Sequence, residues 1–544
     1  MEERVQTSSR SWWRHEVIYQ IYPRSFQDSN DDGVGDLRGI MRRLDYLAGL
    51  GVRVVWISPI YPSPMADFGY DISDYEGIHP LFGTMEDFDL LMSEVHKRGM
   101  KLLLDLVPNH TSDQHPWFLE SKSSKDNPKR DWYIWHDPSP KGGPPNNWRA
   151  AFGGPGWEWD EATKQYYYHA FLKEQPDLNW RNPAVQQAMF NMMRFWLKKG
   201  VDGFRIDVLW HLIKDSQFRD NPVNPDYQPH MATYDELLPI YSTDQFEVHD
   251  VVKGMRAVLN EFNDRIMIGE IYLPISKLVK YYGVDNTGVQ LPFNFQLITL
   301  PWSSQKISAA IQEYEAALPP GGWPNWVLGN HDQPRIASRV GSHQARVAAV
   351  LLLTLRGTPT IYYGDEIGMR DVPIPKNEVQ DPQGLNMPDK NLSRDPARTP
   401  MQWSGKEKNA GFTNGHPWLR LDRNYRQQNV ESQEQDPGSM LTLYEKLIAL
   451  RNTEESLASG NYYPIHSDHQ MICYARFVSG SDPFLIALNL TPRIAYFGPD
   501  GVKFEGIIEI STSPEVEGHT VQDQIILSGD EAIVVRLKSN NLPL

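Results

Sequence analysis

The chain has 544 residues, 40% of them apolar and 22% charged, which are the proportions of a globular protein rather than of a disordered chain. This length exceeds one ordinary core, so we expect about two or three domains, one of which can be a large α/β barrel. The formal net charge of −16 is spread without a long run of one sign, which argues against a nucleic-acid partner, since phosphates need a basic face.

The single cysteine, Cys473, excludes an internal disulfide and disfavours a thiol-bound metal. We interpret it as a small buried apolar residue. The amino-terminal sequence MEERVQTSSRSWWRHE lacks the apolar stretch of a secretory signal, and no apolar run approaches the roughly 20 residues that span a bilayer. These features predict a cytoplasmic protein without a membrane partner.

Short runs rich in β-branched and aromatic residues recur along the chain, and helix-like segments follow most of them. Eight runs are predicted strands, at 17–26, 52–60, 101–110, 201–208, 265–272, 288–295, 325–332 and 358–366. Apolar residues three and four apart predict helices between them, as at 85–99 and 184–200. This alternation predicts a closed (β/α)8 TIM barrel. An open doubly wound sheet is the alternative, but no G-x-G-x-x-G turn follows the first strand.

The loop after the first predicted strand, DSNDDGVGDL at 28–37, combines oxygen-bearing side chains with two glycines. Such oxygens suit a hard divalent cation, and Gly33 stands where an EF-hand loop needs its sharp turn. Gly39 occupies the twelfth position in place of glutamate, which argues against an EF-hand. Two hypotheses remain, an exposed acidic turn and a shorter loop that holds Ca²⁺ or Mg²⁺. The oxygens for a cation would come from Asp28, Asn30, Asp32, the Val34 carbonyl and Asp36.

Two segments interrupt the alternation of strands and helices. Residues 111–176 are rich in Pro, Gly and Trp and carry three consecutive tyrosines, and a loop this long predicts an inserted subdomain. Residues 369–437 form a second, irregular excursion, and helical spacing resumes at 440–452. From about residue 466, short alternating strands predict a small all-β domain. The predicted domains are a barrel of 1–110 and 177–465, a subdomain of 111–176 and a β domain of 466–544.

Acidic residues gather at the carboxyl ends of the predicted strands, where barrels of this kind hold their active sites. In GFRID (203–207), Arg205 and Asp207 face the same side of one strand, so the guanidinium is expected to keep Asp207 ionised. Glu270 ends the apolar strand IMIGE, where desolvation is expected to raise its pKa and keep it protonated. One ionised and one protonated carboxyl group are what acid-assisted glycoside cleavage uses.

Asp332, which follows Asn330 and His331 in the sequence, supplies a third carboxylate. Its negative charge would stabilise a positive charge that develops on a sugar ring. A two-metal hydrolase site is the alternative for acids and histidines on a barrel. Against it, the chain shows no closely spaced H-x-H pair, and Arg205 beside Asp207 disfavours a cation there.

Four motifs, in order, resemble the signature regions of the α-amylase superfamily of glycoside hydrolases. They are DLVPNH (105–110), GFRIDV (203–208), GE (269–270) and GNHD (329–332). QPDLNW (175–180) resembles a fifth region in the form found in oligo-1,6-glucosidases and related α-glucosidases. The likeness runs from about residue 13 to the carboxyl end. It implies a (β/α)8 barrel, a subdomain inserted after the third strand and a C-terminal β-sandwich.

The resemblance also implies roles for individual residues. Asp207 would be the nucleophile, Glu270 the general acid/base and Asp332 the acid that stabilises an oxocarbenium-like transition state. Arg205, His110 and His331 would hold the glucose unit. FGYDISDY (68–75), with Asp67 before it, and ARTPMQW (397–403) resemble the segments that form the pocket of α-glucosidases. This likeness implies that Asp67 and Arg398 grip the non-reducing glucose and that Tyr70 stacks on it. A closed pocket of this kind implies exo-action, in which glucose leaves one unit at a time with retained α-configuration.

Substrate and metal follow from the same likeness. The expected substrates are small α-glucosides such as isomaltose, maltose, sucrose or related oligosaccharides. Val208, after the nucleophile, resembles enzymes that cleave α-1,6 bonds, although VLWHLIKDSQFRDNPVNPDY departs from the VIN of oligo-1,6-glucosidases and suggests a broader tolerance of linkage. Relatives bind a structural Ca²⁺ or Mg²⁺ in the loop after the first strand, which favours the cation hypothesis for 28–36.

Two other functions fit parts of this pattern. A sucrose- or trehalose-acting relative, either hydrolase or isomerase, would share every catalytic residue, and transfer of glucose to another hydroxyl would use the same covalent intermediate. A non-catalytic interaction domain occurs on the same barrel in amino-acid transporter subunits. Those subunits have lost catalytic carboxylates, whereas this chain keeps Asp207, Glu270 and Asp332.

Overall fold

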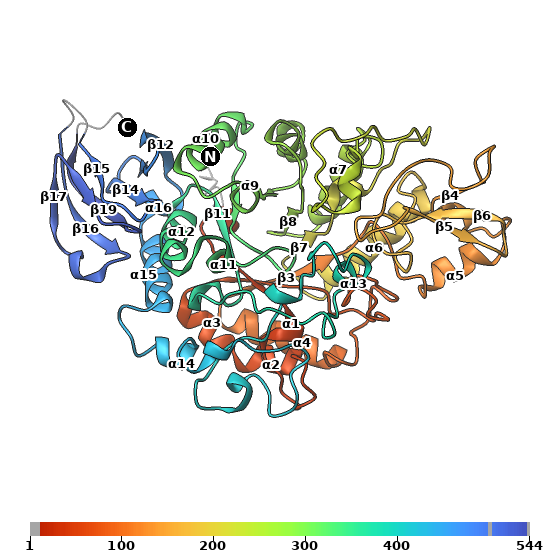
Figure 1. Cartoon of the computed structure of the whole chain (residues 1–544), viewed down its shortest axis with the longest axis horizontal. Coiled ribbons are helices and arrows are strands. Elements are labelled where there is room, and N and C mark those ends of the chain that lie inside the picture. Colours follow the sequence, from red (N-terminus) through yellow and green to blue (C-terminus); the bar gives the residue numbers. More distant parts are fainter. Residues whose placement is uncertain (1–10, 499–502, 541–544) are drawn as a thin grey trace, which may run out of the picture.

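The computed structural model describes residues 11–498 and 503–540, and a closed barrel of eight parallel strands forms its centre (Figure 1). The order around the barrel is β1-β11-β10-β9-β8-β7-β3-β2. Its strands are β1 (Ile18–Ile21), β2 (Val54–Ile57), β3 (Lys101–Leu106), β7 (Gly203–Ile206), β8 (Ile266–Gly269), β9 (Leu291–Asn294), β10 (Asn325–Val327) and β11 (Thr358–Tyr362). Each lies within one predicted run, so the predicted barrel is confirmed. Residues 1–10 and 541–544, counted with the predicted domains, lie outside the described residues.

Each barrel strand divides its side chains between two cores. In β2, Val54 and Trp56 pack with alternate residues of other strands inside the barrel, whereas Val55 and Ile57 join the larger core under the helices. This division follows from the two-residue period of a strand that is buried on both faces.

Helices surround the barrel and form its connections. They are α1 (Pro23–Phe26), α2 (Leu37–Arg42), α3 (Leu44–Leu50), α4 (Met85–Lys97), α6 (Pro183–Lys198), α7 (Val248–Leu259), α8 (Ile275–Leu278), α9 (Gln296–Thr299), α10 (Ser304–Ala317), α11 (Ile336–Val340) and α12 (Ser342–Thr354). Local sequence sets their starts: Thr84 and Asp87 form a capping box on α4, and Asn182 caps α6 ahead of Pro183.

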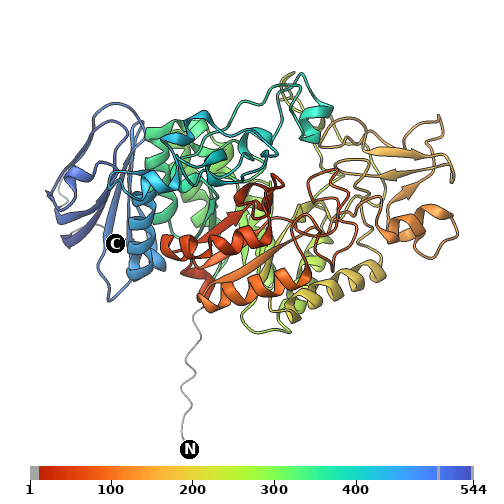
Figure 2. The ribbon, with the colours of Figure 1, turned by 90° about the horizontal axis from the view of Figure 1, so that it is seen from below.

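The insertion after β3 has its own small sheet and lies on the side of the barrel opposite the C-terminal strands (Figures 1 and 2). It contains α5 (Pro116–Ser123) and the antiparallel strands β4 (Trp135–His136), β6 (Gln165–Tyr168) and β5 (Trp157–Asp160), in that order. Trp148, Trp157 and Tyr168 form its core, which explains the aromatic composition of the segment.

Residues 207–247, between β7 and α7, form an irregular segment that the sequence did not predict. It contains the short 3₁₀ helices η3 (Leu209–His211) and η4 (Thr233–Glu236). The segment packs on the insertion, since the indole of Trp148 donates to the carbonyl of Arg219 at 2.9 Å and Arg149 pairs with Glu236 at 3.0 Å. It therefore forms part of the rim of the barrel.

The second excursion contains α13 (Pro382–Asn386) and α14 (Val430–Gln433) among short 3₁₀ turns, and α15 (Met440–Thr453) and α16 (Glu455–Ala458) follow it. The C-terminal domain pairs a six-stranded antiparallel sheet with a two-stranded one across a separate core. Its strands are β12 (Asn461–Ser467), β13 (Met471–Phe477), β14 (Phe484–Asn489), β15 (Ala495–Phe497), β16 (Phe504–Ser511), β17 (Thr520–Gln522), β18 (Ile525–Leu527) and β19 (Ala532–Asn540). The first strand begins at Asn461, ahead of the predicted start at 466.

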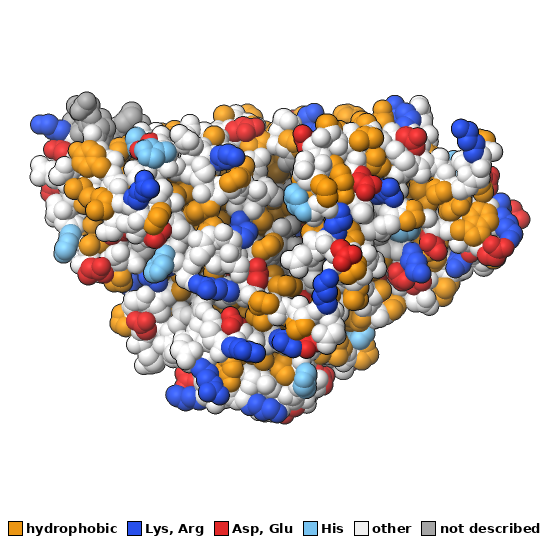
Figure 3. Space-filling view, in the orientation of Figure 1, with side chains coloured by type: hydrophobic (Ala, Val, Ile, Leu, Met, Phe, Trp, Pro, Cys, Tyr) orange, Lys and Arg blue, Asp and Glu red, His pale blue; other side chains and the backbone are white. Residues whose placement is uncertain are grey.

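Cys473 lies in the core of this C-terminal domain and is 1% exposed, as predicted for a buried apolar residue. No helix among the described residues combines the length and the apolar composition needed to cross a membrane. Acidic and basic side chains are interspersed on the face shown in Figure 3, without a large patch of one sign.

Candidate active site

A cavity of about 870 Å³ lies at the carboxyl ends of the barrel strands, between the insertion and the segment 371–397. Most of the predicted site residues line it. These are Asp67, Tyr70, His110, Asp207, Val208, Glu270, His331 and Asp332. Arg205 and Arg398 are not part of the lining but lie directly behind it. The predicted catalytic and glucose-binding residues therefore gather at one place, although they come from many segments of the chain.

Arg205 connects three carboxylates beneath the cavity. Its guanidinium donates to Asp105 at 2.8 Å and to Asp207 at 2.7 Å, and it lies 2.6 Å from Oε2 of Glu270. The side chain is completely buried, so no water screens these interactions. One positive charge thus holds the nucleophile and acid/base candidates in fixed positions on neighbouring strands.

Burial changes the protonation of this cluster. It raises the pKa of Glu270, as predicted, and it raises the pKa of Asp105 to about 6 against the opposing charge of Arg205. Arg205 does favour the ionised form of Asp207, as predicted, but burial and the charges of Glu270 and Asp105 outweigh it and raise the pKa of Asp207 well above its ordinary value. One guanidinium is shared by three carboxylates, which favours the retention of a proton within the cluster.

The backbone of Val208 fixes the orientation of Glu270. Its N–H donates to Oε2 of Glu270 at 2.9 Å, and Arg205 faces the same oxygen, which leaves Oε1 to carry the transferable proton. Val208 adopts the left-handed conformation, with φ of 38°, which is strained for a β-branched residue. The turn after the nucleophile is therefore held in a strained conformation that directs an N–H at the acid.

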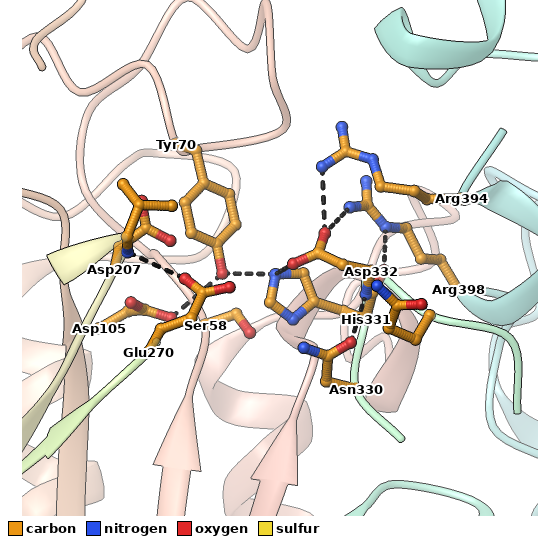
Figure 4. A network of polar contacts seen from close by, with 12 residues as sticks. Ser58, Tyr70, Asp105, Asp207, Glu270, Asn330, His331, Asp332, Arg394 and Arg398 are labelled. Carbon is orange, nitrogen blue, oxygen red and sulfur yellow. Dashed lines mark hydrogen bonds and ion pairs between the residues drawn. The ribbon is translucent and has the colours of Figure 1, made fainter. Parts of the chain in front are cut away.

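A chain of hydrogen bonds sets the tautomer of His331 (Figure 4). The amide of Gln20 lies 2.8 Å from Nδ1, and the hydroxyl of Tyr70 lies 2.6 Å from Nε2. Tyr70 also donates to Asp105 at 3.1 Å. Since Tyr70 has a single proton to donate, His331 must donate from Nε2 and accept at Nδ1. Burial lowers the pKa of His331 well below its ordinary value, so the ring is neutral.

Asp332 stands at the cavity surface between two arginines (Figure 4). Arg394 donates to it at 3.1 Å and Arg398 at 2.9 Å. Burial alone would raise the pKa of Asp332, but His331 and the two guanidinium groups hold it well below its ordinary value. Asp332 is therefore the ionised carboxylate of the site.

The guanidinium beside Asp67 belongs to Arg394, whereas the arginine predicted to grip glucose together with Asp67 is Arg398. Arg394 donates to Asp67 at 2.7 Å and to Asp381 at 2.6 Å, and it lines the cavity. Arg398 is 1% exposed and donates to the carbonyl of His331 at 2.7 Å. Arg398 therefore supports Asp332 and His331 from behind, and Arg394 is the arginine that faces the cavity beside Asp67.

Tyr70 and His110 occupy neighbouring parts of the wall. The Tyr70 ring stacks on His331 with centroids 5.3 Å apart, and Tyr70 is 5% exposed. Nε2 of His110 lies 3.1 Å from the Tyr70 carbonyl, and burial lowers the pKa of His110 to about 4. His110 is therefore a neutral group at the cavity surface.

The loop at 28–36 is held by its own side chains. Asp28 accepts from the amides of Asn30 and Gly33, each at 2.8 Å, and from the hydroxyl of Thr413 at 2.6 Å. Asp36 caps α2 by accepting from Gly39 at 2.7 Å. The oxygens have the chemistry that a hard cation prefers. However, no three His, Cys, Asp or Glu side chains in the described part of the chain are grouped so that they could hold a metal ion.

Several residues of the cavity wall were not predicted. They are Phe152, Phe171, Gln175, Trp210, His211, Tyr272, Gln333 and Arg394. Only two had a signal in the sequence: Gln175 begins the QPDLNW motif, and Arg394 stands four residues before Arg398. The others lie on the insertion or on the turns that follow β7, β8 and β10, where tertiary packing decides which side chains face the cavity.

Comparison with known proteins agrees with this site. Residues 20–460 match the family model of the alpha amylase catalytic domain. The oligo-1,6-glucosidase of Parageobacillus thermoglucosidasius is 40% identical, over 97% of this chain and 99% of that protein. The alpha-glucosidase of Apis mellifera is 44% identical, over 80% and 78% respectively. Among solved structures, the alpha-glucosyl transfer enzyme XgtA gives a TM-score of 0.92 at 37% identity, covering 97% of this chain and all of XgtA.

The isomaltulose synthase PalI of Klebsiella sp. LX3 gives a TM-score of 0.90 at 36% identity, with the same coverage of the two chains. The barrel, the acidic cluster at its strand ends and these comparisons define one class of enzyme. The chain belongs to the alpha-amylase family and is a glycoside hydrolase.

Proposed function

We propose that this enzyme is a retaining, exo-acting α-glucosidase that releases glucose from the non-reducing end of short α-glucosides. The observation that carries the proposal is the buried ion pair of Asp67 and Arg394, which lines the cavity together with Tyr70 and His331. We expect a terminal glucose to bind beside this ion pair, because its hydroxyls would meet charged and neutral hydrogen-bonding groups there. The ion pair would also leave no room for a further sugar, which accounts for exo-action.

The first chemical step uses Asp207 and Glu270. Asp207 attacks the anomeric carbon while Oε1 of Glu270 gives its proton to the glycosidic oxygen, so the bond to the leaving group breaks as the bond to Asp207 forms. The retained proton of the cluster must lie on Glu270 at this moment and leave Asp207 ionised. The ionised Asp332 stabilises the positive charge that develops on the sugar ring.

In the second step, Glu270 acts as a base. It removes a proton from water, the water oxygen attacks the anomeric carbon, and Asp207 leaves with its electron pair. Glucose is released with its original α-configuration after two inversions. Another hydroxyl compound in place of water would give transfer of glucose through the same intermediate, and the similarity to an alpha-glucosyl transfer enzyme supports this second outcome.

For the substrate, we propose α-1,6- and α-1,4-linked disaccharides, with Val208 favouring isomaltose. The relatives named oligo-1,6-glucosidase support this choice. A sucrose-acting isomerase is the second candidate, because several similar structures are trehalulose or isomaltulose synthases. The test measures initial rates of glucose release from isomaltose, maltose and sucrose, with product analysis for isomers. Conversion of sucrose to an isomer at a higher rate than glucose release from the other sugars would favour the second candidate.

The catalytic assignment has its own test. Asp207→Asn should lower kcat for glucose release by more than about 1,000-fold, since it removes the nucleophile without changing its shape. Asp215→Asn, at an ion pair with the half-exposed Arg219 on the same segment, is the matched control. Activity of the folded Asp207→Asn variant within tenfold of the unchanged enzyme would overturn the assignment.

We propose further that the loop at 28–36 holds a structural Ca²⁺ or Mg²⁺ through Asp28, Asn30, Asp32, the Val34 carbonyl and Asp36. Support comes from the oxygen donors at alternate positions. The cation would stiffen the loop and take no part in the chemistry. Removal with a chelator should lower the melting temperature by several degrees and leave the rate at room temperature nearly constant. An unchanged melting curve would show that the hydrogen bonds of the loop suffice.

A further inference from the structure

A continuous series of aromatic rings forms one wall of the cavity. Neighbouring ring centroids are 5.5 Å apart for Phe152 and Phe171, 5.4 Å for Phe171 and His211, 4.8 Å for His211 and Trp210, and 5.6 Å for Trp210 and Tyr272. All five residues line the cavity, and we call them the aromatic wall. Phe295 stacks behind Tyr272 at 3.9 Å and holds that ring in place.

The backbone connects the aromatic wall to the general acid. Tyr272 follows Glu270 by two residues, and the N–H of Leu209 in η3 donates to the Glu270 carbonyl at 3.2 Å. The N–H of Val208, just before η3, donates to the Glu270 carboxylate. Trp210 and His211 are therefore fixed relative to the proton donor. Because Glu270 protonates the glycosidic oxygen, the leaving-group unit must lie on this side of the site, away from Asp67.

His211 is an unusual member of this wall because its imidazole makes no hydrogen bond within the described residues. The residue is 3% exposed, and Nδ1 is buried without a partner. Nε2 is exposed where Nδ1 is buried, so Nε2 is the ring nitrogen at the cavity surface. Buried polar groups almost always have a partner, and the exceptions need an explanation.

The surroundings of His211 keep the ring neutral. Burial lowers its pKa well below the ordinary value, and the nearby Lys214 lowers it further. Lys214 itself is satisfied by Asn109 at 2.7 Å and by an ion pair with Asp177, so it does not compete for the imidazole. A neutral imidazole has one N–H and one lone pair, and Nε2 can bond a hydroxyl in either tautomer.

We propose that the aromatic wall is the subsite for the leaving-group unit and that Nε2 of His211 bonds a hydroxyl of that unit. This inference rests on the proposed α-glucosidase function, which does not say where the leaving-group unit of the substrate binds. The ligand is a ring-shaped unit with an apolar face and at least one hydroxyl, such as the reducing-end sugar of a disaccharide or an incoming acceptor. His211 is thus a specificity-determining residue.

The test compares substrates with and without this unit. α-Glucosyl fluoride carries only the glucose, whereas maltose and isomaltose carry a second sugar. In His211→Phe, which keeps a ring but loses the polar nitrogen, the ratio of kcat/KM for the disaccharides to kcat/KM for the fluoride should fall by about three- to tenfold. His211→Gln, which restores a polar group, should recover part of that ratio.

A histidine outside the cavity gives the matched control. His249 on α7 contacts the rings of Phe246 and Tyr281, and His249→Phe should leave the ratio unchanged. An unchanged ratio in His211→Phe, whether both rates stay the same or both fall equally, would overturn the inference. Failure of the unchanged enzyme to hydrolyse α-glucosyl fluoride would instead contradict the proposed function itself.

Discussion

Arg394→Met tests how the part of the cavity lined by Asp67 and Arg394 holds glucose. The guanidinium of Arg394 contacts three carboxylates, Asp67, Asp332 and Asp381, and its side chain is only 7% exposed. A charge-assisted hydrogen bond contributes about 1.5–3 kcal/mol, so the loss of one such bond from Arg394 to a glucose hydroxyl should lower kcat/KM about 10- to 150-fold. Arg398 still pairs with Asp332, which keeps part of the electrostatic support for the transition state.

Stability enters the same experiment. Removal of one partner from a buried ion pair costs about 3–5 kcal/mol, and Asp381 is fully buried, so the melting temperature of Arg394→Met should fall. The kinetic assay is therefore run well below that temperature, with circular dichroism to verify the fold. Arg394→Lys, which keeps the charge but not the planar fork, should show a smaller loss.

The control lies on the neighbouring segment. Arg420 pairs with Glu378 and is 47% exposed, so Arg420→Met should change kcat/KM by less than about twofold. A folded Arg394→Met enzyme with kcat/KM within threefold of the unchanged enzyme would refute the argument that the Asp67–Arg394 pair binds the glucose.

Three further substitutions test other parts of the structure. Burial raises the pKa of Asp365 to about 7, with Arg335 and Arg339 opposing and Glu366 adding to the shift. The stability that its proton provides is present below about pH 4 and is lost as the pH rises through about 7. The melting temperature of Asp365→Asn should therefore rise relative to that of the unchanged enzyme between pH 5 and pH 8, and a difference that stays constant with pH would contradict this. Arg451 on α15 is buried and donates to the carbonyls of Leu353 and Leu355, at the end of α12, and of Leu457 on α16. Arg451→Met should lower the free energy of unfolding by about 2–4 kcal/mol with little change in KM, and an unchanged urea transition would refute its role. Gln20→Glu replaces the amide donor with a carboxylate, which can only accept a hydrogen bond and so favours the tautomer with the proton on Nδ1. It should therefore reduce kcat/KM more than Gln20→Leu, and equal losses would contradict the assigned tautomer.

The sequence predicted the barrel because each of its strands is a short buried run that ends in polar residues. Asp105, Asp207 and Glu270 end such runs, and the geometry of a parallel barrel brings strand ends together. Their positions could therefore be inferred without knowledge of any loop. The same logic did not give the protonation of Asp207, because that depends on three carboxylates that converge on one guanidinium from separate strands.

The rest of the site could not be predicted for a different reason. Arg394, Trp210 and His211 lie on irregular segments that have neither the helical nor the strand period, so the sequence does not show which side chains face the cavity. Arg394 and Arg398 both belong to SRDPARTPMQW, and only tertiary packing shows which of them lies beside Asp67. The aromatic residues of the insertion were likewise indistinguishable from core residues until their contacts were known.

The most direct test of the central claim is the anomeric form of the first glucose released from α-glucosyl fluoride, whose leaving group is not a sugar, followed by proton NMR within the first minutes of reaction. The double displacement at Asp207 predicts that α-glucose is formed first and that β-glucose grows in only as fast as spontaneous mutarotation. If β-glucose is formed first, or if no glucose is released from isomaltose or maltose, the enzyme is not a retaining α-glucosidase.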